Sequence, residues 1–528
     1  MRLDVIVVGA GFAGLYMLHR ARGLGLSARV FEDGAGVGGT WYWNRYPGAR
    51  CDIESLEYSY QFDERLQQEW RWSERFAAQP EILRYADHVA DRFGLRRDIQ
   101  LNTRVVAAHF DESARRWTVR TADGVEATAR FLVMATGCLS VPNRPRLPGL
   151  DVFRGAVYHT GAWPHDKVDF RGLRVGVIGT GSSAVQSIPL IAEEALSLVV
   201  FQRTATYSVP ARNAPLDPAY EAHVKADYAS FRARNSQMPN AFGSNLPRNE
   251  ASALAATPQE RRRAFEERWR HGGLFLLGAF GDLILDARAN ETAAEFVRDK
   301  IRAAVRDPAL AERLLPRQRI GCKRLCLDSG YYETYNRDNV ELVDVNEAPI
   351  EGATPRGLRA GGRDYALDAI VFATGFDAMT GALARIDIRG RGARALSEAW
   401  AGGPRSYLGL AVAGFPNLFT ITGPGSPSVL TNMLVSIEQH VSWIADCIAQ
   451  MSARGHATIE ALPQAQDAWV AHVNAVADRT VYPLCNSWYL GANVPGKPRV
   501  FMPLLGFPAY VKKCDEVVAR GYEGFALA

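Results

Sequence analysis

A glycine motif that occurs twice, at residues 9–14 and 179–184, constrains the fold of this chain more than any other feature. In each copy an apolar, β-branched run precedes the glycines and a helical pattern follows them. Such a run predicts a strand that is buried on both faces of a parallel sheet. Strand, glycine turn and helix in this order form the fingerprint of a dinucleotide-binding unit. The sequence therefore predicts an α/β protein with two Rossmann-like dinucleotide-binding domains.

The first copy has a strand at Leu3–Val8, the turn GAGFAG, a helix over Leu15–Leu24 and a second strand at Ala28–Phe31 that leads into Glu32. Its glycines let the backbone approach a pyrophosphate held at the helix N-terminus. Glu32 can accept hydrogen bonds from a ribose, and its charge would repel a 2′-phosphate. The first unit therefore fits an adenine nucleotide with a free ribose, such as FAD.

The second copy has a strand at Leu173–Ile178, the turn GTGSSA, a helix, and a strand at Leu198–Phe201. The distance from the first glycine to the residue after the second strand is 23 positions in both copies. At this place the second copy carries Gln202, followed by Arg203 and Thr204. An arginine and a hydroxyl can bind a 2′-phosphate, so this unit fits NADPH. The alternative, that Arg203 only ends a strand, does not account for the matched spacing.

Two further apolar runs end in glycine turns, FLVMATG at 131–137 and IVFATGFD at 370–377, and suit crossovers between nucleotide domains. After residue 208 helix formers rich in Arg and Glu replace the strand signals, as in Pro258–Arg270, which indicates a helical insertion in the NADPH domain. We expect the first part of the FAD domain at 1–140, the linker and first part of the NADPH domain at 141–208, the insertion at 209–332, the second part of the NADPH domain at 333–380, and the second part of the FAD domain with a C-terminal cofactor loop at 381–528.

The composition excludes several classes of function. A formal charge of +4 on 528 residues, with no long basic block, argues against nucleic acid or an anionic membrane as partner. The seven cysteines are scattered without a CxxC pair, so we expect neither a disulfide framework nor a metal site, and a reducing, cytoplasmic setting. No apolar stretch is long enough to span a bilayer.

Two polar segments could carry chemistry. The loop GGTWYWNRYPGARCD at 38–52 ends in Asp52, an acid that needs a partner if it lies near a flavin. The segment CKRLCLDSGYYETYN at 322–336 contains Lys323 and Arg324. If Asp52 meets Arg324, the site has an oriented guanidinium above the flavin. The alternatives are an aromatic packing loop and an ordinary surface pair of cations.

Two late segments could complete a cofactor site. GPGSPSVLTNMLVSIEQH at 423–440 opens with glycines and prolines and continues as a helix, whose N-terminus could stabilise negative charge on a reduced flavin. Met433 lies early in this helix, and a gap-filling core methionine is an equally good interpretation. NSWYLGANVPGKPR at 486–499 is a loop with Trp488 that could cover a cofactor or pack a chain terminus.

With these residues in place, the chain resembles the type I Baeyer–Villiger monooxygenases nearly end to end. FRGAVYHTGAWP at 153–164, between the two glycine motifs, resembles the fingerprint of that family, and Trp163 favours ketone oxidation. The resemblance is greatest to the phenylacetone monooxygenase group, through the motifs VFQRT, YYETYNRDNV, ATGFD, GPGSPS and GANVPGKPR.

The resemblance implies FAD, NADPH and O₂ as reactants with a small hydrophobic ketone, in a protein that is a monomer. It implies oxidation to an ester or lactone through a flavin C4a-peroxide and a Criegee adduct, with sulfoxidation as a side activity. Arg324 would be the catalytic cation and Asp52 would hold it, whereas His159 would couple the domains. Two alternatives stay open: a monooxygenase that oxidises nitrogen or sulfur, and a flavoprotein that binds nucleotides without oxygenation.

The resemblance also assigns cofactor contacts in both domains and in the late loops. They are Gly9, Gly11, Ala13, Gly14, Glu32, Thr40, Trp41, Arg50, Cys51, Asp52, Ile53, Tyr58, Val105, Gly179, Thr180, Gly181, Ser182, Ser183, Arg203, Thr204, Lys323, Arg324, Met433 and Trp488.

Overall fold

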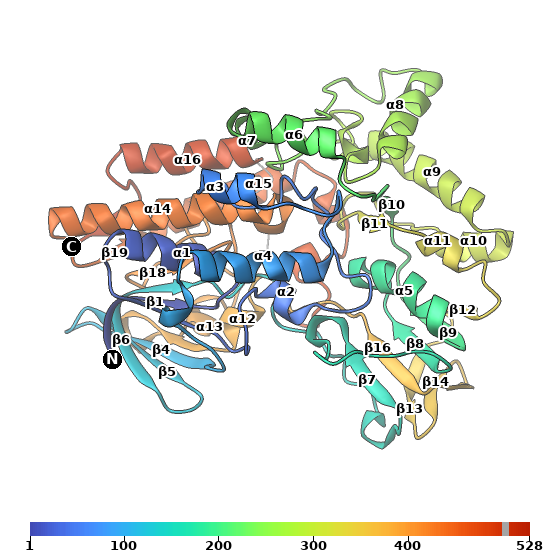
Figure 1. The fold of residues 1–528 in the computed structure, drawn as a ribbon, viewed down its shortest axis with the longest axis horizontal. Coiled ribbons are helices and arrows are strands. Elements are labelled where there is room, and N and C mark those ends of the chain that lie inside the picture. Colours follow the sequence, from blue (N-terminus) through green and yellow to red (C-terminus); the bar gives the residue numbers. More distant parts are fainter. Residues whose placement is uncertain (499–505) are drawn as a thin grey trace.

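The computed structural model describes residues 1–498 and 506–528, so Arg499, the last residue of the predicted C-terminal loop, lies outside the described residues. The chain forms two bodies that lie side by side, and both chain ends belong to the first body (Figure 1). The start and the end of the chain, blue and orange-red, build this first body, whereas the middle of the chain builds the second (Figure 1). An eight-stranded sheet organises the first body and a five-stranded sheet the second.

The sheet of the first body has the order β17-β4-β5-β6-β1-β2-β3, with β18 also paired to β6. The apolar strand β1 pairs in parallel with β2 and β6, which places Val8 opposite Phe31 and Met134. Both faces of β1 are buried, because Val5 and Val7 pack in one apolar cluster, whereas Ile6 and Val8, which point to the opposite face, pack in a second cluster. The strands are β1 Arg2–Val8, β2 Ala28–Phe31, β3 Ile99–Gln100, β4 Val105–Asp111, β5 Arg116–Thr121, β6 Glu126–Met134, β17 Asp387–Arg389 and β18 Leu418–Thr420.

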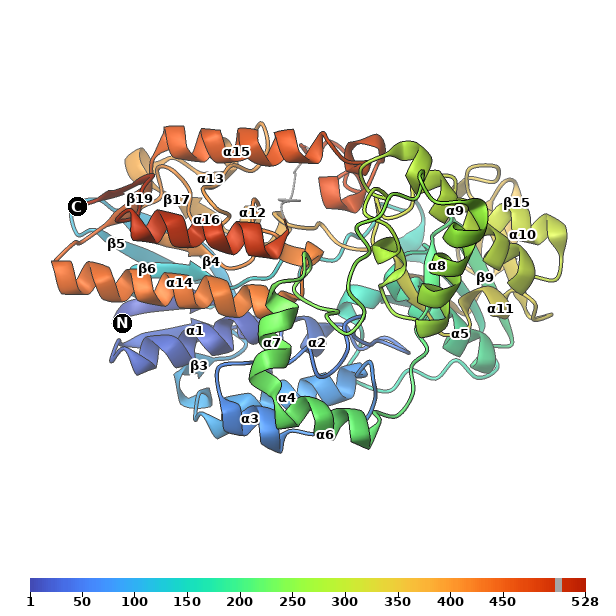
Figure 2. The ribbon, with the colours of Figure 1, turned by 90° about the horizontal axis from the view of Figure 1, so that it is seen from above.

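Helices from both ends of the chain cover this sheet, and α1 lies against α14 (Figures 1 and 2). The helix α1 begins at Phe12, earlier than the predicted Leu15, because it starts directly after the extended Gly11. The elements are α1 Phe12–Gly23, α2 Thr40–Trp43, α3 Glu64–Glu69, α4 Gln79–Arg92, α12 Gly381–Ala384, α13 Leu396–Ala399, α14 Met433–Arg454, β19 Ile459–Ala461, α15 Pro463–Ala477, α16 Phe507–Ala519 and β20 Phe525–Leu527.

The second body has an all-parallel sheet in the order β12-β9-β8-β16-β7. Its strand β8 repeats the relationship of β1, because Ile178 lies opposite Phe201 and Phe372 at the ends of its neighbours. The prediction of two Rossmann-like units is therefore confirmed. The elements are β7 Ala156–His159, β8 Arg174–Ile178, α5 Ser182–Glu194, β9 Ser197–Gln202, α11 Tyr331–Thr334, β12 Val340–Asp344, β13 Ile350–Thr354, β14 Gly357–Ala360, β15 Arg363–Ala366 and β16 Ala369–Phe372.

A helical segment between β9 and β12 touches both bodies. Its helices α6 and α7 reach the first body, where the Tyr228 hydroxyl donates to the Leu56 carbonyl and Lys225 donates to the Trp70 carbonyl (Figure 2). Its helices α8 and α9 pack in the same apolar cluster as α5 of the second body. The elements are β10 Ser208–Pro210, α6 Pro218–Ala226, α7 Tyr228–Ser236, α8 Pro258–His271, α9 Ala287–Ala304, α10 Pro308–Leu314 and β11 Cys326–Asp328.

Among the helices in the described ranges, none has the length and apolarity needed to cross a membrane. Within 1–498 and 506–528 the structure also contains no group of His, Cys, Asp and Glu side chains that could hold a metal ion.

Candidate functional site

The two glycine turns are built alike, and each lies against a crossover turn. Gly9 has a φ of +105°, and a Cβ added there would lie 2.6 Å from the Ala135 carbonyl oxygen. Gly179 has a φ of +111°, and its Cβ would lie 2.5 Å from the Ala373 carbonyl oxygen. Ala135 and Ala373 begin the two A-T-G turns. Both the backbone conformation and the lack of space therefore require glycine at these two positions.

The helix after each turn presents backbone N–H groups to a ligand. Gly11 and Gly181 stand at the N-caps of α1 and α5, and neither first helical turn contains an acidic residue. Gly14, in the first turn of α1 next to Ala13, packs so closely that a Cβ would lie 1.8 Å from the Gly9 carbonyl oxygen. Uncapped N–H groups and the helix dipole favour a bound phosphate. The residues present thus fit the pyrophosphate of a dinucleotide in each body.

Glu32 closes the first nucleotide site. Its carboxylate is buried and accepts the N–H of Ala10 over 2.6 Å and the N–H of Gly34 over 2.8 Å. Burial raises the pKa of Glu32, while these two N–H groups oppose the shift. The carboxylate keeps unused lone pairs that can accept ribose hydroxyl groups. The turn, the helix and this acid fit FAD.

Two cations, Arg203 and Lys323, lie near each other at the second nucleotide site. Burial and the charge of Arg203 lower the pKa of Lys323. Among the described residues no carboxylate pairs with either side chain. The turn that carries Arg203 is held in place, because the Thr180 hydroxyl donates to the Thr204 carbonyl over 2.7 Å and Asn346 donates to the Arg203 carbonyl over 2.7 Å. Like charges brought together favour a bound anion, and the pair fits the 2′-phosphate of NADPH.

Arg324 and Asp52 form a bidentate ion pair between distant parts of the chain. Nε of Arg324 donates to Oδ2 over 2.5 Å, and Nη2 donates to Oδ1 over 2.8 Å. Nη1 donates to the Val429 carbonyl over 2.7 Å. Burial alone would lower the pKa of Arg324, but Asp52 raises it above its usual range, so the guanidinium stays charged. Three of its five N–H groups are engaged in these bonds, and the Tyr489 side chain is a further neighbour of the guanidinium.

An apolar cluster lies next to Arg324, where the first crossover, the second crossover, the start of α14 and the C-terminal loop meet. Met433 begins α14, which Asn432 caps by accepting the N–H of Leu434. The ring of Trp488 contacts the ring of Tyr489 at a tilt of 49°, with centroids 4.4 Å apart. The buried members are Cys138, Ala378, Met379, Val429 and Tyr489, and the half-buried members are Leu139, Leu430, Met433, Tyr482 and Trp488. The structure therefore brings Met433 and Trp488 to the same place.

His159 contacts both crossovers. Its Nδ1 accepts the N–H of Gly161 over 2.9 Å, so the ring proton lies on Nε2, which is 3.3 Å from the Asn143 carbonyl oxygen and 3.3 Å from the Thr374 hydroxyl. Burial lowers the pKa of His159 to about 4, so the ring is neutral at pH 7. A neutral histidine joined to two crossovers suits a structural link between the bodies better than an acid or base.

The other predicted cofactor contacts lie in the segment of residues 40–58, at the start of β4 and at the start of α5. Trp41, buried in α2 beside the exposed Thr40, donates from Nε1 to the Tyr58 hydroxyl over 3.1 Å. Arg50 pairs with Glu74 over 2.6 Å. Val105 begins β4 and is buried in the same apolar cluster as Val8, whereas Cys51 and Ile53 are buried on either side of Asp52. In the second body, Ser182 Oγ lies 3.3 Å from Cys326 Sγ, and Ser183 Oγ lies 3.0 Å from Thr160 Oγ1.

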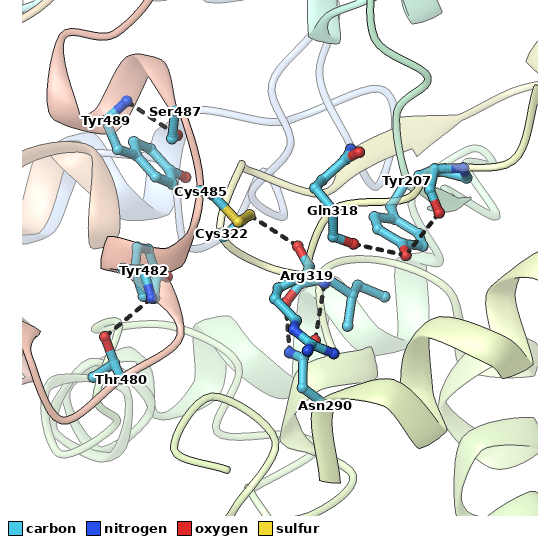
Figure 3. The surroundings of a disulfide bond; sticks show 12 residues. Tyr207, Asn290, Gln318, Arg319, Cys322, Thr480, Tyr482, Cys485, Ser487 and Tyr489 are labelled. Carbon is cyan, nitrogen blue, oxygen red and sulfur yellow. Dashed lines mark hydrogen bonds between the residues drawn. A yellow bond between two sulfur atoms is a disulfide. The ribbon is translucent and has the colours of Figure 1, made fainter. Parts of the chain in front are cut away.

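The expectation that the chain has no disulfide is wrong. Cys322 and Cys485 are joined by an S–S bond, with a Cα–Cα distance of 6.2 Å, which is normal for such a bond (Figure 3). The partners are 163 positions apart, so no spacing motif marks them, and only the fold brings them together.

Sequence reasoning missed several residues at the seam between the bodies. Gln186 accepts the Tyr46 hydroxyl over 2.8 Å and donates to the Arg50 carbonyl over 3.1 Å. Lys497 donates to Asp377 over 2.5 Å and so ties the C-terminal loop to the second crossover. The loops at 38–52 and 486–499 were predicted to lie near a cofactor, but their sequences do not indicate which distant residues they contact. Tyr489 was missed although it adjoins Trp488.

Comparisons with known proteins find monooxygenases that are similar over nearly the full length of this chain. The family of pyridine nucleotide-disulphide oxidoreductases matches residues 6–233. A Baeyer-Villiger monooxygenase of Pseudooceanicola batsensis is 44% identical over 524 residues, which cover 98% of this chain and 95% of the relative. A phenazine N-monooxygenase of Lysobacter antibioticus is 43% identical over 99% of this chain and 97% of its own length. The solved structure of an oxidized steroid monooxygenase bound to NADP has a TM-score of 0.95 and 55% identity, and covers 100% of this chain and 99% of that chain.

Proposed function

The chain belongs to the Baeyer–Villiger monooxygenases, which contain FAD and use NADPH, and we propose that it oxidises ketones to esters or lactones with Arg324 and Asp52 as its catalytic residues. The observation that carries the assignment of residues is the bidentate ion pair between them. It joins a charged guanidinium from the second body to the first body, beside an apolar cluster.

FAD, when bound and reduced by NADPH, would activate the O₂ that provides the oxygen atom inserted next to the ketone carbonyl. The contribution of Arg324 is electrostatic, because its positive charge can stabilise negative charge on the reacting oxygen. Asp52 fixes the direction of the guanidinium, so that no reorganisation is needed when this charge develops. The Val429 carbonyl accepts a third N–H and limits rotation of the group.

Arg203, Lys323 and Thr204 would bind the 2′-phosphate of NADPH. Two observations support this proposal. Arg203 and Lys323 lie near each other, and hydrogen bonds to the carbonyls of residues 203 and 204 fix the turn that carries Arg203. Lys323 precedes Arg324 directly, so phosphate binding and the position of the catalytic cation depend on the same short loop. Binding of NADPH would therefore also order the loop that carries Arg324.

The apolar cluster next to Arg324 would hold the ketone and exclude water. Its aliphatic and thioether side chains offer contact area and no hydrogen-bond partners to water, which strengthens the electrostatic effect of Arg324. Val429, Leu430 and Met433 come from the start of α14 and the turn before it. A hydrophobic ketone is the substrate class that fits this lining.

Oxidation of nitrogen or sulfur is a second candidate function. The observation in its favour is the relative that is a phenazine N-monooxygenase, which matches nearly the full chain. Both reactions use the same cofactors, so only the products distinguish them.

We further propose a monomer that acts in the cytoplasm and has the domain boundaries given above. The Cys322–Cys485 disulfide is unusual for a reducing compartment, and the thiol state of the protein in cells tests this location.

The experiment that tests the function measures NADPH consumption with linear, cyclic, aromatic and steroid ketones, an amine and a sulfide, and identifies products by mass spectrometry. Esters or lactones formed in proportion to NADPH support the ketone assignment. N-oxides or sulfoxides alone, with no ester from any ketone, would support the second candidate instead.

A further inference from the structure

The Cys322–Cys485 disulfide joins the two segments that carry residues of the candidate site. Cys322 directly precedes Lys323 and Arg324 in the sequence, whereas Cys485 lies just before Trp488 and Tyr489. Nothing in the reaction as described uses this bond. Both cysteines are buried, so the bond lies inside the molecule, at the place where the C-terminal loop meets the loop of Arg324.

The Cys322 end of the bond is firmly held. Fully buried Asn290 donates to the Ile320 carbonyl over 2.8 Å, and its Oδ1 accepts the N–H of Ile320 over 3.1 Å. The Tyr207 hydroxyl donates to the Gln318 carbonyl over 3.0 Å, and the Gln318 side chain donates to the Ala205 carbonyl over 2.8 Å (Figure 3). The loop that leads to Cys322 is therefore fixed to α9 and to the second body.

The Cys485 end has few anchors of its own. In the described part of the chain, the backbone N–H groups of residues 484–492 donate only to acceptors within residues 481–492. The Ser487 N–H, for example, donates to the Cys485 carbonyl over 3.1 Å. Anchors to other segments begin at Asn493, which donates to the Phe376 carbonyl over 2.7 Å, and at Lys497. The disulfide is thus the covalent tie between the turn of residues 485–490 and the loop of Arg324.

We propose that this disulfide is a positioning bond, which keeps Trp488 and Tyr489 beside Arg324 so that they retain the nicotinamide nucleotide. The inference rests on the proposed function, because it takes Trp488 to cover NADP(H). Cys322 and Cys485 touch no substrate and act through these two aromatic residues. Losing the tie means that NADP⁺ must itself order the turn, and this cost appears as weaker binding.

The bond can be opened and closed by chemistry of known balance. A dithiol gives two electrons and two protons to the two sulfur atoms, which become two thiols while the dithiol becomes a cyclic disulfide. Hydrogen peroxide reverses this, because the two thiols give up two electrons and two protons and the peroxide is reduced to two molecules of water.

The first test counts thiols in the purified holoenzyme, unfolded without reductant and treated with an alkylating agent. Seven cysteines with one disulfide give five alkylated residues, and mass spectrometry places the unmodified pair at 322 and 485. Seven alkylated residues in protein purified without reductant would overturn the proposal.

The second test compares Cys322→Ser, Cys485→Ser and the double variant with wild type, and uses Cys447→Ser as the control for loss of a buried cysteine far from the site. The readout is the Kd of NADP⁺ for the oxidised holoenzyme, followed by the flavin absorbance change, together with ester formed per NADPH consumed. We expect about a tenfold higher Kd in all three variants, equal among them, and a lower ester yield per NADPH. Cys447→Ser should match wild type in both.

Wild type that has been treated with a dithiol until alkylation counts seven thiols should show the Kd of the variants, and the same treatment should leave the double variant unchanged. This arm also serves if a variant does not fold. A lower Tm with unchanged Kd and yield would mean that the bond only stabilises the fold, and the proposal would be wrong. The Kd is independent of ester formation. A protein that forms no ester from any ketone, yet shows these changes in Kd, would refute the proposed function and keep the positioning bond.

Discussion

Asp52 and Arg324 are 272 positions apart in the chain, yet they form a bidentate ion pair with N–O distances of 2.5 and 2.8 Å. Asp52 belongs to the body with the first glycine turn, and Arg324 follows the helical segment attached to the other body. One interaction therefore joins the proposed catalytic cation to both nucleotide sites. A small change in how the bodies meet would change the direction of the guanidinium.

Asp52→Asn tests whether the carboxylate positions Arg324. Asparagine keeps the shape of the side chain but replaces one acceptor oxygen by an NH₂ donor. Arg324 therefore loses one of its two hydrogen bonds to residue 52 and the negative charge of its partner. We expect ester formation to fall by up to about 10²-fold, as misplacement of a catalytic group does, with FAD still bound. Steady-state rates and flavin absorbance measure both. Wild-type rates in this variant would show that Arg324 does not depend on Asp52.

The two glycine turns predict a pair of selective losses. Gly9→Ala should abolish FAD binding, whereas Gly179→Ala should keep FAD and weaken NADP⁺, because each Cβ would lie 2.5–2.6 Å from a carbonyl oxygen. Gly25→Ala is the matched control, since its φ is +72° but nothing lies within 4 Å of its Cβ. It should bind both nucleotides and lose about 1–2 kcal/mol of stability from strain alone. If Gly25→Ala also lost nucleotide binding, strain and not lack of space would explain all three.

Arg203 and Lys323 predict how the enzyme distinguishes NADPH from NADH. Each charged hydrogen bond to the 2′-phosphate contributes about 1.5–3 kcal/mol, so Arg203→Ala or Lys323→Ala should raise the KM for NADPH by about 10- to 100-fold. The KM for NADH, which lacks this phosphate, is the internal control and should change little. Equal increases for both cofactors would place the phosphate contact elsewhere.

Glu57 predicts a dependence of stability on pH. It is buried, its Oε1 accepts the N–H of Gly243 over 2.8 Å, and burial raises its pKa to about 8. The folded protein therefore holds a proton that the unfolded chain has lost, so this contribution is full below about pH 4.5 and disappears as the pH rises through about 8.

Glu57→Gln removes that titration and keeps an acceptor for Gly243. The free energy of unfolding of the variant relative to wild type should increase from pH 5 to pH 8, by up to about 1.4 kcal/mol per pH unit, and its Tm should rise accordingly. Thermal unfolding of both proteins over this pH range measures the difference. A difference that stays constant with pH would show that Glu57 is ionised in the folded protein.

Local patterns predicted much of the fold. Both glycine turns and their flanking strands followed from short stretches in which apolar runs and glycines stand at fixed spacing. The structure shows why this works: the contacts of Gly9 and Gly179 repeat each other, so one rule applies twice.

Contacts between distant segments were harder to predict. The pairing of Asp52 with Arg324 was stated only as a condition, because each residue has a reasonable alternative when considered alone. The bond between Cys322 and Cys485 was denied, because scattered cysteines without a spacing motif favour free thiols. The position of each partner depends on how the two bodies and the helical segment pack together, and no local pattern contains this information.

The most direct test of the account is the amount of ester formed per NADPH consumed by Arg324→Ala holoenzyme with stoichiometric FAD. Arg319→Ala, an arginine of the same loop that pairs with Glu291, is the matched control and should behave as wild type. We predict that Arg324→Ala binds FAD and NADP⁺ but forms ester about 10²–10³ times more slowly, as expected when a charge-stabilising group is removed. Ester formation at the wild-type rate in Arg324→Ala would contradict the central claim.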